Sequence, residues 1–297
     1  MSSQSVLRYG IVSKTATYWN AYVALDQGFY AREGLDVQFT ATGSTAATIR
    51  AVVTGAVDLG GCSPDELISA RAEGQDLVIV GGVINRPVSR IVGLPGMRSL
   101  GDLIGKRVGV NQIRGSVSMV MKAALHDAGL PEGSCRLIEA GTTPEMAQKL
   151  RDGEIDAAML TAPFDMVMLA DGFSSLADVG RLFPRYAFTT VNARRGWVDA
   201  HPEEVAAFFR ATRSAGMEIG ASRRQKQRVL SPLGRHTGLT GSALEQTYGI
   251  YQAPGVLSRR GEIRPGALQA VIGLMEDQGL LPGRRPLVRE LVAPRWR

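Results

Sequence analysis

Residues 43–58 read GSTAATIRAVVTGAVD, and residues 141–156 read GTTPEMAQKLRDGEID, ninety-eight positions later. Both stretches keep two glycines, a Ser/Thr pair, a β-branched residue and an aspartate at constant offsets, which indicates duplicated architecture. Each is typical of a loop that opens a helix, a glycine that closes it, and a short apolar strand. Two such units require two sheets or lobes. A ligand is then expected in a cleft between them.

Apolar runs and helical periodicity extend this pattern in both directions along the chain. The first unit is predicted to hold strands over 7–12, 36–39, 58–60 and 77–83, and helices over 19–27, 46–54 and 65–72. The second is predicted to hold strands over 106–110, 135–139 and 157–160, and helices over 116–128 and 143–152. Residues 90–94 are interpreted as a crossover. A strand over 187–191, a helix over 202–222 and a mostly helical tail complete the prediction.

The predicted fold class is therefore α/β, with two Rossmann-like lobes joined by a hinge that the chain crosses twice. The tail shows no third copy of the repeat, so we expect it to return and pack on the first lobe. Lobe 1 is then discontinuous, with residues 1–90 and 188–297, and lobe 2 comprises residues 91–187. The two crossings are expected near residues 86–95 and 184–192.

Composition places the chain among ordinary globular proteins. It has 297 residues, 44% of them hydrophobic and 21% charged, with room for two domains of about 100–150 residues each. The net charge of +6 comes from basic residues late in the chain, without the aromatic interleaving or zinc-finger spacing of nucleic-acid binders. We interpret them as a solvated basic face and expect no nucleic-acid partner. These residues are Arg223, Arg224, Lys226, Arg228, Arg235, Arg284, Arg285, Arg289, Arg295 and Arg297.

No apolar run approaches the roughly 18 residues that span a bilayer, and the first five residues lack a basic head before a hydrophobic core. The expected location is the periplasm if a leader was removed, and the cytoplasm if the chain is native as given. Cys62 and Cys135 fall in different units, so no disulfide is expected between them.

Ligands of open parallel sheets bind beyond the carboxyl ends of strands, where loops lead into helices. The segments at that position are 13–19, 42–45, 62–65 and 84–86 in the first lobe, and 111–116, 141–143 and 160–164 in the second. Their free N–H groups and positive helix ends favour a carboxylate, sulfonate, phosphate or nitrate. This reasoning alone adds Arg86, Gly115, Thr143 and Phe164 to the candidate ligand-binding residues.

Several candidates have a structural alternative. Ser63, Thr142 and Thr143 belong to capping-box sequences, so they either cap helices only or also contact the ligand. Tyr18 and Trp19 start a helix and are either core residues or a stacking platform.

The candidates that carry charge or a nucleophile have alternatives as well. Arg86 is either an anion clamp or part of a surface salt bridge, and Arg114, beside Gly115 and Ser116, is the better anion contact. Cys62 is expected to be an inert pocket residue unless a base activates it, and His126, His201 and His236 lie outside the nominated loops. No spacing of ligating residues suggests a metal, and no cofactor motif is present, so we expect neither.

Residues 24–37, ALDQGFYAREGLDV, resemble a hallmark of the NMT1/THI5-like group of ABC-importer substrate-binding proteins, the nitrate, sulfonate, taurine and thiamin-precursor branch with a type II periplasmic-binding-protein fold. Further matches are Gly55-Ala-Val-Asp58, the octapeptide DLIGKRVG at 102–109, and Gly153-Glu-Ile-Asp156 followed by Pro163. The likeness covers residues 7–191 well and the tail loosely. The cysteine-rich motif of the eukaryotic pyrimidine synthases is absent.

This resemblance implies a two-lobed binder that closes on one small molecule and delivers it to the permease and ATPase of an importer, as a monomer. The possible ligands include a sulfonate, taurine, nitrate, an aromatic acid and a pyrimidine. The binding positions carried over by the resemblance are Tyr18, Trp19, Ser44, Thr45, Cys62, Ser63, Asn85, Gln112, Arg114, Ser116, Thr142 and Thr161.

Three functions are compatible with the sequence. The leading hypothesis is capture of a small anionic or heteroaromatic solute without turnover. The second is a cytosolic enzyme on the same scaffold, such as a sulfinate desulfinase that uses Cys62 as nucleophile. The third, a ligand-sensing transcription factor, is weak because a strand predicted from Leu7 leaves no space upstream for a helix-turn-helix.

Overall fold

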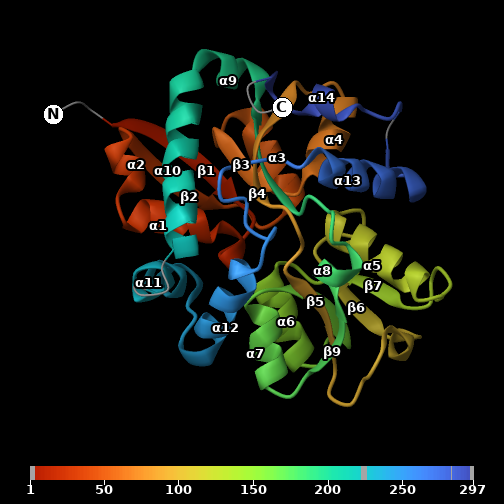
Figure 1. Ribbon diagram of the computed structural model, residues 1–297. Helices are drawn as coiled ribbons and strands as arrows, with labels where there is room; N and C mark the ends of the chain where they lie inside the picture. The colour runs from red at the N-terminus through yellow and green to blue at the C-terminus, as the bar shows by residue number, and fades with distance from the viewer. Residues whose placement is uncertain (1–3, 222–225, 282, 295–297) are drawn as a thin grey trace.

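The computed structural model describes residues 4–221, 226–281 and 283–294 and contains two five-stranded sheets (Figure 1). Their strand orders are β2-β1-β3-β10-β4 and β7-β6-β8-β5-β9. The predicted α/β class with two Rossmann-like lobes is confirmed. The strands are β1 Ser5–Ile11, β2 Leu35–Ala41, β3 Leu59–Cys62, β4 Leu77–Ile84, β5 Ser89–Gly93, β6 Arg107–Val110, β7 Arg136–Glu139, β8 Ala157–Thr161, β9 Ser174–Asp178 and β10 Thr189–Arg194.

Helices cover both sheets, as the apolar faces of parallel strands require. They are η1 Ala16–Tyr18, α1 Trp19–Asp26, α2 Phe29–Arg32, α3 Thr45–Thr54, α4 Pro64–Ala72, η2 Leu100–Leu103, α5 Ser116–Asp127, α6 Thr143–Arg151, α7 Phe164–Ala170, α8 Val179–Leu182, α9 Arg195–Ala200, α10 Pro202–Ala221, α11 Lys226–Thr237, α12 Gly241–Gln252, α13 Pro265–Asp277 and α14 Val288–Leu291.

Each sheet receives one strand from a crossing of the chain. The antiparallel strand β5 lies between β8 and β9, and the antiparallel strand β10 lies between β3 and β4. The interpretation of residues 90–94 as a crossover is wrong, because Arg90 to Gly93 pair within the second sheet. The chain changes sheets between Ile84 and Ser89 and returns between Leu182 and Thr189.

The duplicated residues perform the same structural task in both lobes. The Arg8 side chain and backbone N–H donate to Asp58, with Nη2 2.6 Å from Oδ1, and Arg107 donates to Asp156 in the same way at 2.8 Å. Strand glycines make room for the β-branched residues of the repeat. A Cβ added at Gly10 would lie 3.1 Å from Val57, and one added at Gly109 would lie 2.6 Å from Ile155.

The tail contacts both lobes, not only the first as predicted. Helix α10 packs on α1 and α2 of the first lobe, whereas α12 lies against α7 and α13 bridges α4 and α5 (Figure 1). The Gln278 side chain also donates to the Met119 carbonyl of α5 at 2.8 Å. Long helices after a second crossing can reach either lobe, and the apolar periodicity of the sequence does not specify which one.

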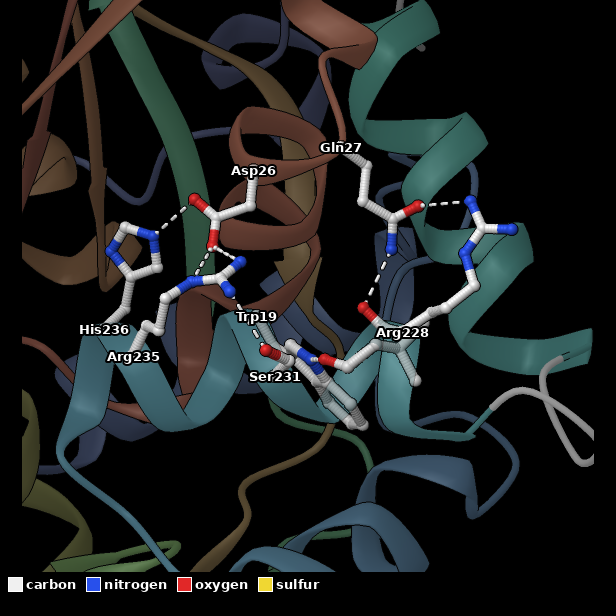
Figure 2. Close-up of polar contacts among 8 residues, drawn as sticks. Trp19, Asp26, Gln27, Arg228, Ser231, Arg235 and His236 are labelled. Atoms are coloured by element: carbon white, nitrogen blue, oxygen red, sulfur yellow. Dashed lines mark hydrogen bonds and ion pairs between the residues drawn. The ribbon is translucent and has the colours of Figure 1, made fainter.

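Helix α11 is fixed to α1 by polar contacts that Figure 2 shows. The Asp26 carboxylate accepts hydrogen bonds from Arg235 at 2.6 Å and pairs with His236 at 3.0 Å. The Trp19 indole N–H donates to the Val229 carbonyl at 2.6 Å. Partial burial raises the pKa of Asp26, but the hydrogen bonds from His236 and Arg235 outweigh it and lower the pKa below its ordinary value.

The basic residues of the tail are largely paired on the surface, as a solvated face requires. Within the described ranges, Arg228 pairs with Glu218, Arg284 with Glu290, and Arg285 with Glu276. Ser222 and four of the predicted basic residues, Arg223, Arg224, Arg295 and Arg297, lie outside the described residues. None of the described helices combines the length and the hydropathy of a membrane span.

Candidate ligand-binding site

A cavity of about 80 Å³ lies between the two lobes. One water needs roughly 10–15 Å³ measured with a water-sized probe, so the cavity has room for a molecule of several non-hydrogen atoms. Residues from both copies of the repeat meet there, since Thr45 and Thr143 are both in its wall. The wall is formed by Val12, Ser13, Thr15, Thr17, Tyr18, Thr45, Cys62, Ser63, Asn111, Gln112, Gly115, Ser116, Val117, Thr143, Thr161, Phe188 and Thr189.

Helix starts supply three of the hydroxyl groups in the polar wall. Thr45 and Thr143 are the first residues of α3 and α6, and Ser116 is the first residue of α5. Their position follows from the repeat, because each Gly-Ser/Thr loop ends a strand and opens a helix at the same edge of its sheet. Most residues of this wall carry a hydroxyl or amide group, and among the described residues no Lys, Arg or His side chain belongs to it.

Two aromatic rings provide apolar surface. The Tyr18 hydroxyl donates to the Gly61 carbonyl at 2.7 Å and accepts from the Val12 N–H at 3.1 Å, so it is fixed by the strands. Burial, with a further contribution from Tyr9, raises the pKa of Tyr18 well above its ordinary value and keeps the phenol protonated. Phe188 reaches the cavity from the segment that returns to the first sheet.

Cys62 lines the cavity but is not activated. Its sulfur lies 3.3 Å from the Asn192 amide nitrogen, which donates to it. Burial raises the pKa of the thiol well above its ordinary value, and the charge of Asp65 raises it further. A nucleophilic cysteine needs the opposite environment, with a lowered pKa and a nearby base.

Ser63 connects the cavity wall to a buried carboxyl group. It is the N-cap residue of α4, yet its hydroxyl donates to the Asp65 side chain and does not cap the helix. The predicted Ser63 capping box is therefore wrong. The Ser63 hydroxyl is bound instead by the nearby Asp65 carboxylate, which is a strong hydrogen-bond acceptor because it can carry a charge. Burial raises the pKa of Asp65, while the Ser63 hydroxyl and the backbone N–H of Ser116 across the cleft oppose this rise.

Residues 16–221 match the family model described as NMT1/THI5 like. The chain belongs to the NMT1/THI5-like family. It is 29% identical over 139 residues to a putative thiamine biosynthesis protein of Haemophilus influenzae, covering 46% of this chain and 43% of that one. It is 26% identical over 196 residues to a formylaminopyrimidine-binding protein of Halalkalibacterium halodurans, covering 64% and 58%. The chain thus spans about half the length of the curated relatives it matches.

A solved structure of the same fold is the alkanesulfonate-binding protein of Xanthomonas axonopodis pv. citri bound to MOPS. The TM-score is 0.81 with 21% identity, and the superposition covers 99% of both chains. At this identity the likeness establishes the fold. The type II periplasmic-binding-protein architecture expected of an NMT1/THI5-like protein is confirmed.

More than half of the ligand-binding residues predicted from the sequence lie in the wall of the cavity. They come from loops of both lobes, in agreement with the rule that ligands bind beyond the carboxyl ends of strands. These residues are Tyr18, Thr45, Cys62, Ser63, Gln112, Gly115, Ser116, Thr143 and Thr161.

Four predicted residues outside the cavity wall serve the fold. Trp19 is fully buried against Tyr248 and Tyr251 of the tail, so it is a core residue and not a platform. Ser44 caps α3 by accepting from the Ala47 N–H at 3.1 Å. Thr142 forms its predicted capping box, and both its N–H and its hydroxyl donate to Glu145. Phe164 packs against the hydrophobic cluster below α6 and α7.

The remaining three predicted residues lie away from the wall. The Asn85 amide donates to the Glu262 carbonyl of the tail at 3.4 Å. Arg86 is half-buried in the segment between the sheets, and Arg114 is exposed. Neither arginine side chain is among the residues that form the cavity.

Four wall residues fall outside the nominated loops: Val12, Val117, Phe188 and Thr189. Val12 and Val117 directly adjoin nominated segments, and a one-residue extension of those loops would have included them. Phe188 and Thr189 belong to the predicted crossing at 184–192. Their position in a strand at the hinge, next to the cleft, could have identified Phe188 and Thr189 as candidate ligand-binding residues. Within the described part of the chain, no group of three or more His, Cys, Asp or Glu residues is placed to hold a metal ion.

Proposed function

We propose that this protein is the solute-binding component of an ABC importer and captures one small heteroaromatic solute between its lobes. The observation that carries the proposal is the composition of the cavity wall. It combines hydroxyl and amide groups from both lobes with the rings of Tyr18 and Phe188, and no basic side chain of the described residues belongs to it. A planar ring with polar substituents complements such a wall by stacking and hydrogen bonding.

Capture depends on contacts to both lobes at once. Thr45 contributes a hydroxyl from the first lobe, and Thr143 and Thr161 contribute hydroxyls from the second. A solute that bonds to both sides favours the closed arrangement by its differential affinity for it. The closed form is what a permease and its ATPase would recognise, and in this proposal the protein acts as a periplasmic monomer.

The similarity to a formylaminopyrimidine-binding protein supports a pyrimidine-like ring. The similarity in fold to an alkanesulfonate-binding protein, together with the helix starts in the wall, supports a sulfonate, taurine or nitrate as the second candidate class. We favour the heteroaromatic class because a charged sulfonate would be held without a basic side chain in the cavity wall.

The alternative of a desulfinase with Cys62 as nucleophile has less support. The thiol is buried with a raised pKa, and the three histidines lie away from the cavity wall. Capture without turnover therefore remains the proposed activity.

The first experiment is a thermal-shift screen of the whole protein against aminopyrimidines, aromatic acids, alkanesulfonates, taurine and nitrate. A ligand present at 100 times its dissociation constant stabilises by about 2.7 kcal/mol, which is readily detected. Failure of every class to shift a folded sample would refute the proposed capture function. Consumption of a bound solute, followed by chromatography, would instead favour the enzyme.

The second experiment uses the two equivalent threonines of the repeat. Thr45→Val and Thr143→Val each remove a hydroxyl at constant shape, and each should weaken binding about 5-fold, the scale of a net hydrogen bond of ~1 kcal/mol. Thr54→Val is the matched control, because its side chain is exposed at the end of α3. Arg114→Ala should leave affinity unchanged, since that side chain is also exposed. Equal effects of all four changes would show that the solute does not bind in this cavity.

A further inference from the structure

The helix starts in the cavity wall would by themselves favour an anionic ligand. The first residues of α3, α5 and α6 all lie in the cavity wall, and the N–H groups of a first helical turn have no partner within their own helix. An isolated set of this kind is a general anion-binding arrangement. The charges that surround these helix starts decide whether it acts as one here.

Asp65 supplies a negative charge at this position. It is the second residue of α4, is 5% exposed, and accepts a hydrogen bond from Ser63, a residue of the cavity wall. Burial raises the pKa of Asp65, and the backbone N–H groups of Asp65, Glu66 and Ser116 oppose that rise by favouring the ionised form. The amide groups at the starts of α4 and α5 are thus already directed at an internal carboxylate. In the described part of the chain, no Lys, Arg or His forms an ion pair with Asp65.

The charge of Asp65 reaches the inside of the cavity. After burial, Asp65 is the largest cause of the raised pKa of Cys62, whose side chain lines the cavity. Asp65 also raises the pKa of the buried Tyr186 hydroxyl on the segment that returns from the second lobe. A group that disfavours a thiolate in this space disfavours any other anion there for the same electrostatic reason.

We infer that Asp65 is a specificity-determining residue, which makes the cavity select a neutral or protonated N–H-donating heteroaromatic ring and reject anionic solutes of the same size. This inference rests on the proposed capture function and adds the charge of the solute. An amino group on a ring donates to the hydroxyl and amide oxygens of the wall, whereas a carboxylate or sulfonate meets the negative charge of Asp65, which is hydrogen-bonded but forms no ion pair among the described residues. At an effective dielectric constant near 20, repulsion between two like charges at short range is enough to reduce affinity on the order of 10-fold or more.

The test compares two probes that share one ring, 4-aminopyrimidine and pyrimidine-4-carboxylate. Their dissociation constants are measured by calorimetry with the full chain and with its Asp65→Asn variant, which keeps the shape and the acceptor oxygen for Ser63. We expect the parent protein to bind the amino compound at least 10-fold more tightly than the carboxylate. Asp65→Asn should reduce this ratio by at least 10-fold.

The matched control is Asp165→Asn in the other lobe. Asp165 is likewise the second residue of its helix and is 1% exposed, but it lies 3.6 Å from Arg90, a cation that offsets part of its charge. The control should keep the ratio of the parent protein.

Each possible result bears on the inference. An unchanged ratio in Asp65→Asn, the same change in both variants, or a parent protein that prefers the carboxylate would overturn it. The same conclusion follows if a folded parent protein binds neither probe. In that case the solute screen decides separately whether the capture function stands, because any other solute that binds would preserve capture without this selectivity.

Discussion

Replacing Asp165 by Asn should stabilise the protein at neutral and alkaline pH. The carboxyl group is 1% exposed at the start of α7, and its Oδ1 lacks a hydrogen-bond partner among the described residues. Burial raises the pKa of Asp165 from its ordinary 3.8 to about 6, although Arg90, 3.6 Å away, lowers it in part. A carboxyl group with a higher pKa in the folded state destabilises the fold wherever it is ionised.

The magnitude follows from the two pKa values. One pKa unit corresponds to 1.36 kcal/mol, so the rise from 3.8 to about 6 costs about 3 kcal/mol once the group is ionised in both states. The cost is absent below pH 3.8, grows between pH 3.8 and about 6, and is constant above. For a chain of this size, about 3 kcal/mol corresponds to a rise of roughly 6 °C in Tm.

The assay is thermal unfolding of the parent protein and Asp165→Asn from pH 4 to pH 8, followed by circular dichroism without ligand. The variant should unfold several degrees higher at pH 8, and the difference should shrink steadily below pH 6 and nearly vanish at pH 4. A variant that is less stable at pH 8, or a difference that does not depend on pH, would refute the reasoning. Either result would mean that the charge on Arg90 compensates Asp165 fully.

Three further changes test packing and the attachment of the tail. Trp19→Phe removes the indole hydrogen bond to the buried Val229 carbonyl, so unfolding in urea should show a loss of about 1–3 kcal/mol. Gly61→Ala places a Cβ against the Tyr9 hydroxyl and 2.8 Å from the Tyr18 ring, which should cost about 1–3 kcal/mol and also weaken solute binding in calorimetry; a parent-like Tm and affinity would contradict these contacts. Asp26→Asn removes the charge of the α1–α11 contact, and because the pKa of Asp26 is lowered, its stabilisation is present above about pH 4 and lost below. Urea unfolding should therefore show a deficit of about 1 kcal/mol at pH 7 that shrinks as the pH falls below about 4.

The repeat was the most informative part of the sequence, because its residues act locally. Gly10 and Gly109 admit the β-branched residue of each repeat, and Asp58 and Asp156 hold the equivalent strands β1 and β6. These contacts lie within one unit, which is why the repeat keeps these residues at constant offsets. The loops after these strands were correctly placed beside the cavity for the same reason.

Individual side chains at the site were harder to predict. Trp19 begins a helix at the edge of the nominated loops, but it packs against α11 and α12, more than 200 residues away in sequence. Ser63 has the sequence of a capping residue, yet it donates to Asp65. Spacing does not distinguish these outcomes, since each depends on what a distant segment leaves exposed.

The sequence by itself determined a duplicated α/β architecture, the positions of most strands and helices, and the loops that face the cleft. The physical reason is that hydrophobic periodicity, helix caps and glycine positions act over a few residues. Only the tertiary structure decided which side chains of those loops line the cavity, that the tail joins both lobes, and that a buried carboxyl group stands beside the helix starts. Burial and charge compensation arise from contacts between segments distant in sequence, and those contacts exist only once the chain has folded.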